Sequence, residues 1–124
     1  MKRIFLLLGM LCLIGIHSVF AQDESIEYTA CVFPVPLGEI LGETMDCGTF
    51  FVPQDYNEPD GLQVEISFAV LYSTSENPLP DPVIYLEGGP GGSALSGIDD
   101  WATFEMRETR DIILFDQRGA GYSY

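Results

Sequence analysis

The chain has 124 residues, with 19 Asp or Glu, five Lys or Arg and one His, so that its formal net charge is −14. Such a charge repels phosphate backbones and anionic lipid, which argues against nucleic acids and anionic membrane surfaces as partners. It says nothing about the fold.

The first 21 residues have the pattern of a secretory signal peptide. Positive charge at Lys2 and Arg3 precedes an apolar run over residues 4–16, and small residues lead to Ala21 before a polar stretch. This apolar run is shorter than the roughly 20 residues of a membrane-spanning helix. We therefore predict cleavage after Ala21, a secreted or periplasmic protein, and no membrane association after signal cleavage.

Cleavage would leave residues 22–124 with three Arg against 19 carboxylates, a net charge of −16. The only histidine, His17, lies in the predicted signal, so the remaining stretch cannot complete a Ser-His-Asp triad. Without histidine and with only two cysteines, it has no zinc-ligand pattern. We expect no metal and no cofactor.

Cys31 and Cys47 are the two cysteines after the predicted signal, and an oxidising compartment favours a disulfide between them. Cys12 follows the bulky Leu11, whereas a lipid-attachment cysteine follows a small residue. A disulfide closing a loop of this size contributes about 3 kcal/mol. It would fasten the irregular, Pro- and Gly-containing residues 22–46.

Residues 48–52 form a short β-prone run, and residues 55–61 are dense in turn formers. In residues 62–70, Leu62, Val64, Ile66, Phe68 and Val70 alternate with other residues, a period of two that predicts a strand with these side chains on its buried face. Two strands around a turn predict an antiparallel pair at a sheet edge.

Residues 83–86 and 112–115 are unbroken apolar runs, typical of strands covered on both faces in a parallel sheet. The residues between them suffice for a crossover helix, giving a right-handed strand-loop-helix-strand unit. The expected helix has Asp99 and Asp100 at its start, Trp101 and Phe104 on its inner face, and Arg107 and Arg110 near its end.

Residues 87–93, Glu-Gly-Gly-Pro-Gly-Gly-Ser, follow a predicted buried strand. Four glycines in five positions remove the β-carbons at the end of the sheet where open α/β folds bind ligands, and a simple turn needs only one or two. One interpretation is a dinucleotide fingerprint, Gly89-x-Gly91-x-x-Ala94, with Asp116 as the ribose-binding acid. Against it, Pro90 lacks an N–H, an antiparallel pair precedes the unit, and an exported protein meets little nicotinamide cofactor.

The other interpretation is an oxyanion hole, whose backbone N–H groups stabilise the charge on a carbonyl oxygen during acyl transfer. α/β-Hydrolases place one such donor after their third strand and the other after the nucleophile. The glycine loop, residues 87–93, follows the third predicted strand.

The motifs CGTFFVPQDYNEP from Cys47, YLEGGPGGS from Tyr85 and DQRGAGYS from Asp116 resemble the N-terminal third of exported α/β-hydrolases of the proline iminopeptidase and tripeptidyl aminopeptidase family. The resemblance implies an α/β fold, with residues 22–124 an incomplete α/β-hydrolase core domain. That family cleaves amino acids or short peptides from free N-termini with a Ser-Asp-His triad and no metal. By resemblance, Gly89 supplies the first oxyanion-hole N–H, and Gly88 and Gly91 shape the loop.

Many relatives have His at the position of Glu87. A carboxylate facing the oxyanion would oppose catalysis, so we predict that Glu87 turns away and pairs with Arg118. A solvated surface glutamate is the alternative.

Ser93 and Ser123 are not expected to be nucleophiles. Ser93 has Leu95 where Gly-x-Ser-x-Gly requires glycine, and the resemblance places Ser123 in a turn before the nucleophile elbow. Asp116 is expected to be a structural acid. The triad residues are therefore absent from this stretch.

The sequence thus predicts an exported serine aminopeptidase acting on a peptide or aminoacyl substrate with a free N-terminus, and predicts that the 124-residue stretch alone is inactive. A non-catalytic exported binding module or truncated product, or an esterase on the same fold, are the alternatives.

Overall fold

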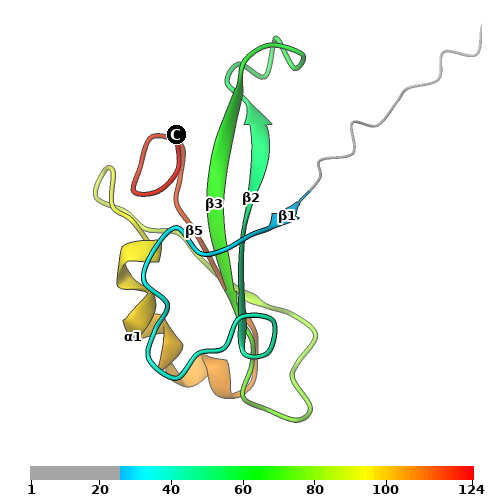
Figure 1. The fold of residues 1–124 in the computed structure, drawn as a ribbon, viewed down its shortest axis with the longest axis vertical. Coiled ribbons are helices and arrows are strands. Elements are labelled where there is room, and N and C mark those ends of the chain that lie inside the picture. Colours follow the sequence, from blue (N-terminus) through cyan, green and yellow to red (C-terminus); the bar gives the residue numbers. More distant parts are fainter. Residues whose placement is uncertain (1–25) are drawn as a thin grey trace, which may run out of the picture.

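A computed structural model describes residues 26–124 (Figure 1). The predicted signal peptide, with Cys12, His17 and Ala21, lies outside the described residues. Within the described range, no helix has both the length and the apolar character that crossing a membrane requires.

Five strands form one mixed sheet: β1 (Glu27–Tyr28), β2 (Met45–Pro53), β3 (Gln63–Leu71), β4 (Val83–Tyr85) and β5 (Ile112–Phe115), in the order β1-β2-β3-β5-β4. The pairs β1–β2, β2–β3 and β3–β5 are antiparallel, and β4 pairs parallel with β5. A mixed sheet with few helices is consistent with part of an α/β-hydrolase. The strand β1 outside β2 was not predicted, because two residues carry too little pattern.

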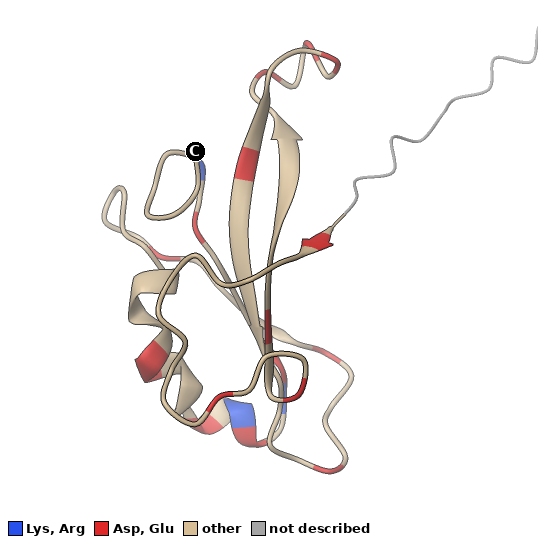
Figure 2. Cartoon of the chain, in the orientation of Figure 1, with Lys and Arg blue, Asp and Glu red and all other residues tan. Residues whose placement is uncertain are grey.

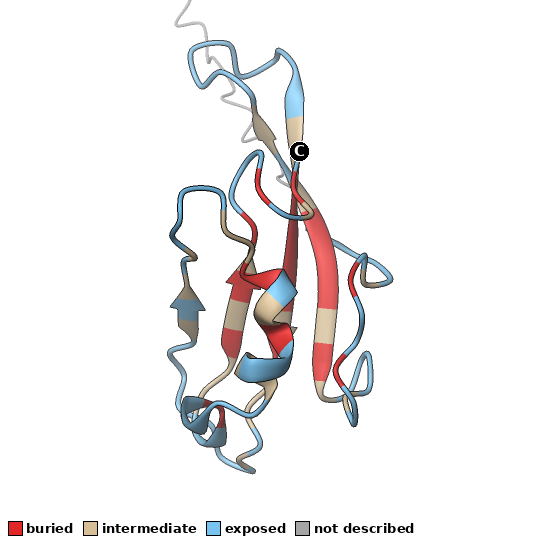
Figure 3. Ribbon diagram, turned by 90° about the vertical axis from the view of Figure 1, so that its left-hand side faces the viewer, coloured by how far each residue is buried: buried red, intermediate tan, exposed pale blue. Residues whose placement is uncertain are grey.

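Alternate residues of three strands form the core face of the sheet. Met45, Leu71, Ile112 and Leu114 are fully buried there, and Leu95 of the segment after β4 packs among them. The helical residues lie against this face, as Figures 1 and 3 show. Burial of these side chains provides the main stabilisation of the fold.

The predicted buried face of residues 62–70 is confirmed only in part: Ile66 and Phe68 are buried, but Leu62 is 77% exposed, and none of the five predicted side chains belongs to the main core cluster. Ala69 and Leu71 belong to the core cluster, whereas Phe68 and Val70 line the opposite face. A period of two shows that the two faces of a strand differ, but not which of them the rest of the chain covers.

The prediction of a single crossover helix between β4 and β5 is wrong. The segment consists of a 3₁₀ turn η1 (Leu95–Gly97), a five-residue helix α1 (Ile98–Ala102) and a second 3₁₀ turn η2 (Glu105–Glu108). Asp99 and Asp100 lie in the first turn of α1 as predicted, but the backbone becomes extended at Phe104, so that Arg107 falls in the last turn of η2 and not at the end of the same helix. Trp101 packs on Tyr85 with ring centroids 4.2 Å apart, while Phe104 stays 38% exposed.

Arg107 joins the irregular N-terminal segment to the residues after α1. Its guanidinium is buried and binds both carboxylate oxygens of Glu39, at 2.6 and 2.7 Å, and the carbonyl oxygens of Thr44, Tyr72 and Ala102. Hydrogen bonding from Arg107 holds the pKa of Glu39 below its usual value. A single side chain therefore connects three segments: the loop before β2, the residue after β3, and the crossover between β4 and β5.

Cys31 and Cys47 form a disulfide, with an S–S distance of 2.01 Å and Cα atoms 5.2 Å apart. The bond fastens the N-terminal segment to β2, beside the core cluster that includes Cys47. Acidic side chains are spread over the loops, the hairpin and the helix and do not gather in one region (Figure 2). The charge of the chain thus does not itself mark a binding site.

The face of the sheet opposite α1 is apolar, and no described helix covers it. A hollow of about 220 Å³ on this face is lined by Ile26, Tyr28, Phe50, Phe68, Val70, Ile113 and Phe115. On β4, which was expected to be covered on both faces, Ile84 is 56% exposed. We refer to the seven lining residues as the open apolar face.

We predict that the 124-residue chain binds the neutral dye Nile red through the open apolar face, because contiguous exposed apolar surface is what such dyes bind. Replacing Ile113 and Phe115 together by Thr, which keeps a strand-favouring residue, should lower the dye fluorescence by about half or more.

The control is Leu37→Thr, since Leu37 is fully exposed but lies outside this face. Equal losses in the double variant and in the control would contradict the assignment of dye binding to the open apolar face.

Candidate functional site

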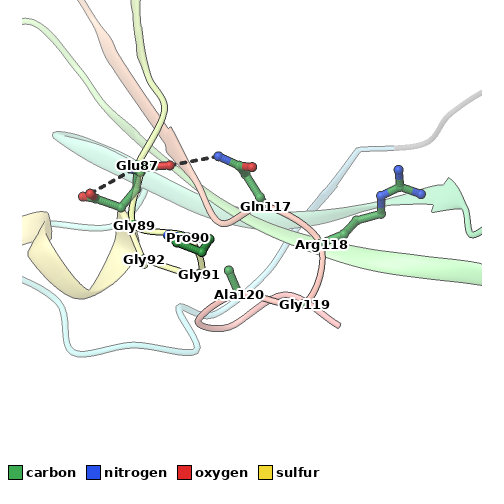
Figure 4. A pocket seen from close by; sticks show the side chains of 10 residues that line it. Glu87, Gly89, Pro90, Gly91, Gly92, Gln117, Arg118, Gly119 and Ala120 are labelled. Carbon is green, nitrogen blue, oxygen red and sulfur yellow. Dashed lines mark hydrogen bonds between the residues drawn. The ribbon is translucent and has the colours of Figure 1, made fainter.

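The glycine loop follows β4, and residues 117–120 follow β5. Because β4 and β5 run parallel, both loops leave the sheet at the same edge. Together they enclose a hollow of about 440 Å³, shown in Figure 4. Its lining residues are Glu87, Gly88, Gly89, Pro90, Gly91, Gly92, Gln117, Arg118, Gly119 and Ala120.

Three positions of the loop require glycine, two because of their backbone conformation and one because it lacks space for a side chain. Gly89 and Gly91 have φ of +132° and +82°, a region that other residues rarely adopt. At Gly92 an added β-carbon would lie 2.5 Å from Glu87 Cγ and 2.6 Å from the carbonyl oxygen of Gly88. At Gly88 a β-carbon would meet nothing within 4 Å, so neither space nor φ demands glycine there.

The backbone amides of the loop differ in their partners. The Gly88 N–H donates to Glu87 Oε1 and the Gly92 N–H donates to the Gly88 carbonyl, each at 3.0 Å. Within residues 26–124, the N–H groups of Gly89 and Gly91 donate to no protein acceptor. Two amides at the rim of the hollow therefore remain available to a ligand.

The carboxylate of Glu87 is hydrogen-bonded to residues close to it in the sequence. Its Oε2 accepts a hydrogen bond from the Tyr85 hydroxyl at 3.0 Å, and its Oε1 accepts from Gly88. The hydrogen bond to Glu87 raises the pKa of Tyr85 above its usual value. The carboxylate thus accepts one hydrogen bond on each oxygen from residues of its own segment.

The predicted pairing of Glu87 with Arg118 is wrong. Arg118 donates to the carbonyl oxygens of Pro53 and Gln54, at 3.2 and 3.1 Å, and its guanidinium lies 5.1 Å from the ring centroid of Tyr56. Figure 4 shows the Glu87 and Arg118 side chains extending in opposite directions. Arg118 thus binds two backbone carbonyl groups at the end of β2, which are far from it in the sequence.

A residue that the sequence reasoning missed joins the two loops. Gln117 Nε2 donates to the carbonyl oxygen of Glu87 at 2.9 Å, which Figure 4 marks with a dashed line. Gln117 lies within the motif DQRGAGYS, but only the parallel register of β4 and β5 shows that it reaches the glycine loop.

Ser93 and Ser123 are both hydrogen-bonded into the structure. The Ser93 hydroxyl donates to Asp116 Oδ2 and the Ser123 hydroxyl to the Asp116 carbonyl oxygen, each at 2.8 Å. The described stretch contains no histidine, so neither serine has an imidazole base. Asp116 is 1% exposed. These contacts agree with structural roles for all three residues.

Among residues 26–124, no cluster of three or more His, Cys, Asp or Glu side chains is arranged to hold a metal ion.

Comparisons with known proteins point to hydrolases of peptides. The chain has homologues among proline iminopeptidases and tripeptidyl aminopeptidases, which supports an α/β-hydrolase peptidase family and a peptidase function at family level. No protein-family model matches the chain.

Three relatives illustrate the similarity. The chain is 44% identical over 62 residues, 50% of its length, to a "Probable proline iminopeptidase" of Leptolyngbya boryana. It is 33% identical over 91 residues, 67% of its length, to a "Tripeptidyl aminopeptidase" of Streptomyces coelicolor. A "Putative hydrolase YuaR" of Escherichia coli is 32% identical over 129 aligned positions, 88% of the chain.

The matched regions make up 18%, 16% and 25% of these three relatives. The chain therefore spans about a quarter of their length or less.

We predict that Gly92→Ala destabilises the protein by about 1–3 kcal/mol, because the new methyl group must displace Glu87 Cγ and the Gly88 carbonyl. Gly88→Ala is the matched control in the same loop and should change the free energy of unfolding by less than about 0.5 kcal/mol. Urea unfolding followed by the fluorescence of Trp101, the chain's only tryptophan, measures both. Equal costs for the two variants would show that the loop is not packed as described.

Proposed function

We propose that this chain is the N-terminal part of an exported serine peptidase of the α/β-hydrolase fold, which releases amino acids or short peptides from free N-termini. The single observation that carries the proposal is the unpaired N–H of Gly89 at the rim of the hollow beyond β4 and β5. The peptidase homologues support it.

In this proposal the Gly89 N–H donates to the oxygen of the scissile carbonyl as negative charge develops there. Removing one donor of this kind costs about 3 kcal/mol of transition-state stabilisation. The positive φ of Gly89 and Gly91 fixes the loop path that leaves the amide unobstructed. Hydrogen bonds from Tyr85 and Gly88 hold the Glu87 carboxylate in place, so that it does not accept from the Gly89 N–H.

The rest of the reaction requires residues outside this chain. A serine attacks the carbonyl carbon, a histidine takes the hydroxyl proton and returns it to the leaving amine, and water then hydrolyses the acyl-enzyme. We assign the second oxyanion donor to the residue after that serine.

Export is the second part of the proposal. Residues 1–21 supply the cleavable signal, and the disulfide between Cys31 and Cys47 suits an oxidising compartment. The mature enzyme would be secreted or periplasmic.

We predict that the 124-residue chain alone does not cleave aminoacyl or tripeptidyl nitroanilides, whereas the chain extended by the coding sequence beyond Tyr124 does. The extension should contain a Gly-x-Ser-x-Gly, then an Asp, then a His. Acetylating the substrate's amino group should lower kcat/KM by about 100-fold or more, if the free N-terminus is recognised as a charged, hydrogen-bonded group.

Replacing Ser93 and Ser123 by Ala in the extended chain is the control and should leave turnover measurable. An extension without the three motifs, or without activity, would instead support a binding module or truncated product. Hydrolysis of esters but not of amides would support an esterase.

A further inference from the structure

The buried carboxylate of Asp116 connects the two loops that enclose the hollow. Its Oδ1 accepts a hydrogen bond from the Leu95 N–H at 3.2 Å, and its Oδ2 accepts from the Ser93 hydroxyl at 2.8 Å and from the Tyr122 N–H at 2.9 Å. Ser93 and Leu95 follow the glycine loop, and Tyr122 follows residues 117–120. One side chain therefore fixes the position of one loop relative to the other.

The hydrogen bond from Ser93 to Asp116 has a defined direction. Ser93 Oγ accepts from the N–H of Ser96 at 3.0 Å and lies 2.8 Å from the Ser96 hydroxyl, which donates to it. With its lone pairs used in this way, the Ser93 hydroxyl directs its proton at the carboxylate. All three groups that contact the Asp116 side chain are thus hydrogen-bond donors, and each requires an acceptor at this position.

Close packing surrounds this carboxylate. A β-carbon at Gly121 would lie 1.9 Å from Asp116 Oδ2 and 2.5 Å from Ser93 Oγ, and Gly121 has a φ of +51°. The backbone of Asp116 is also fixed, because its N–H donates to the carbonyl oxygen of Ser67 on β3. The residue that carries this carboxylate is therefore attached to the sheet through its backbone.

We propose that Asp116 is a positioning residue, which holds the glycine loop so that the Gly89 N–H remains aimed into the hollow. This inference rests on the proposed function, in which Gly89 stabilises an oxyanion. Asp116 does not touch the reacting atoms and acts through Ser93 and Leu95.

An asparagine at this position has the size of aspartate but cannot replace it. Leu95 and Tyr122 donate to different oxygens of the carboxylate. Whichever way the asparagine amide is turned, one of these N–H groups faces the NH₂ group and loses its acceptor. Asp116→Asn therefore removes at least one of the hydrogen bonds that connect the loops, with little change in volume.

The test uses the chain extended beyond Tyr124 and compares its Asp116→Asn variant with the same chain without the substitution. We expect kcat on an aminoacyl nitroanilide to fall by about 10- to 100-fold with KM within about twofold, because displaced donors weaken transition-state binding. Amide hydrogen exchange should show the N–H of Leu95 or of Tyr122 exchanging about tenfold faster or more. Unchanged kcat, or a loss confined to KM, would overturn the positioning role.

Tyr72→Phe is the matched control for a purely structural loss. It removes the hydroxyl that donates to Asp46, near the opposite end of the sheet, and should leave kcat unchanged. If Asp116→Asn does not fold, the Ser93→Ala variant tests the proposal instead. It removes one of the three hydrogen bonds to the Asp116 carboxylate, together with the acceptor of Ser96, and keeps the acceptors of the Leu95 and Tyr122 amides. Its kcat should fall by about two- to tenfold, and an unchanged kcat would overturn the proposal.

The two readouts separate this inference from the proposed function. Full amide protection in Asp116→Asn would refute the connection between the loops and leave the proposed function standing. An unchanged enzyme that cleaves no peptide substrate would refute the proposed function, and with it the catalytic consequence assigned to Asp116.

Discussion

The parallel pairing of β4 with β5 is the constraint on which the candidate site depends. It brings the ends of two strands to one edge of the sheet, so residues 87–93 and 117–120 face each other across a hollow. Hydrogen bonds from Gln117 and to Asp116 then hold the loops in register. Without that pairing, the glycine loop would have unpaired amides but no opposite wall.

The rest of the described chain supports this edge. The core face buries Leu71, Ile112 and Leu114 beneath the short helical segment, and Arg107 and the disulfide fasten the N-terminal residues to it. The opposite face remains apolar and lacks a described cover. This uneven burial agrees with the similarity to a small part of much longer proteins, among them a proline iminopeptidase and a tripeptidyl aminopeptidase.

Local sequence signals predicted much of this arrangement. The strands around the turn at residues 55–61, the two apolar strands and the β-carbon-free loop all have patterns confined to a few residues. Several features did not follow from such patterns, among them the partner of Arg118, the face of β3 that packs on the main core, and the division of the crossover into short helical pieces. Each depends on tertiary contacts, such as the carbonyl oxygens of Pro53 and Gln54 that bind Arg118.

The distance from the Gly89 nitrogen to the charged oxygen of a bound aldehyde transition-state analogue, measured in a crystal of the extended enzyme, tests the account most directly. Oxyanion donors lie about 2.7–3.1 Å from that oxygen, and this is the distance that we predict for Gly89. An oxygen beyond about 4 Å from Gly89, bound by other donors, would contradict the role given to the loop.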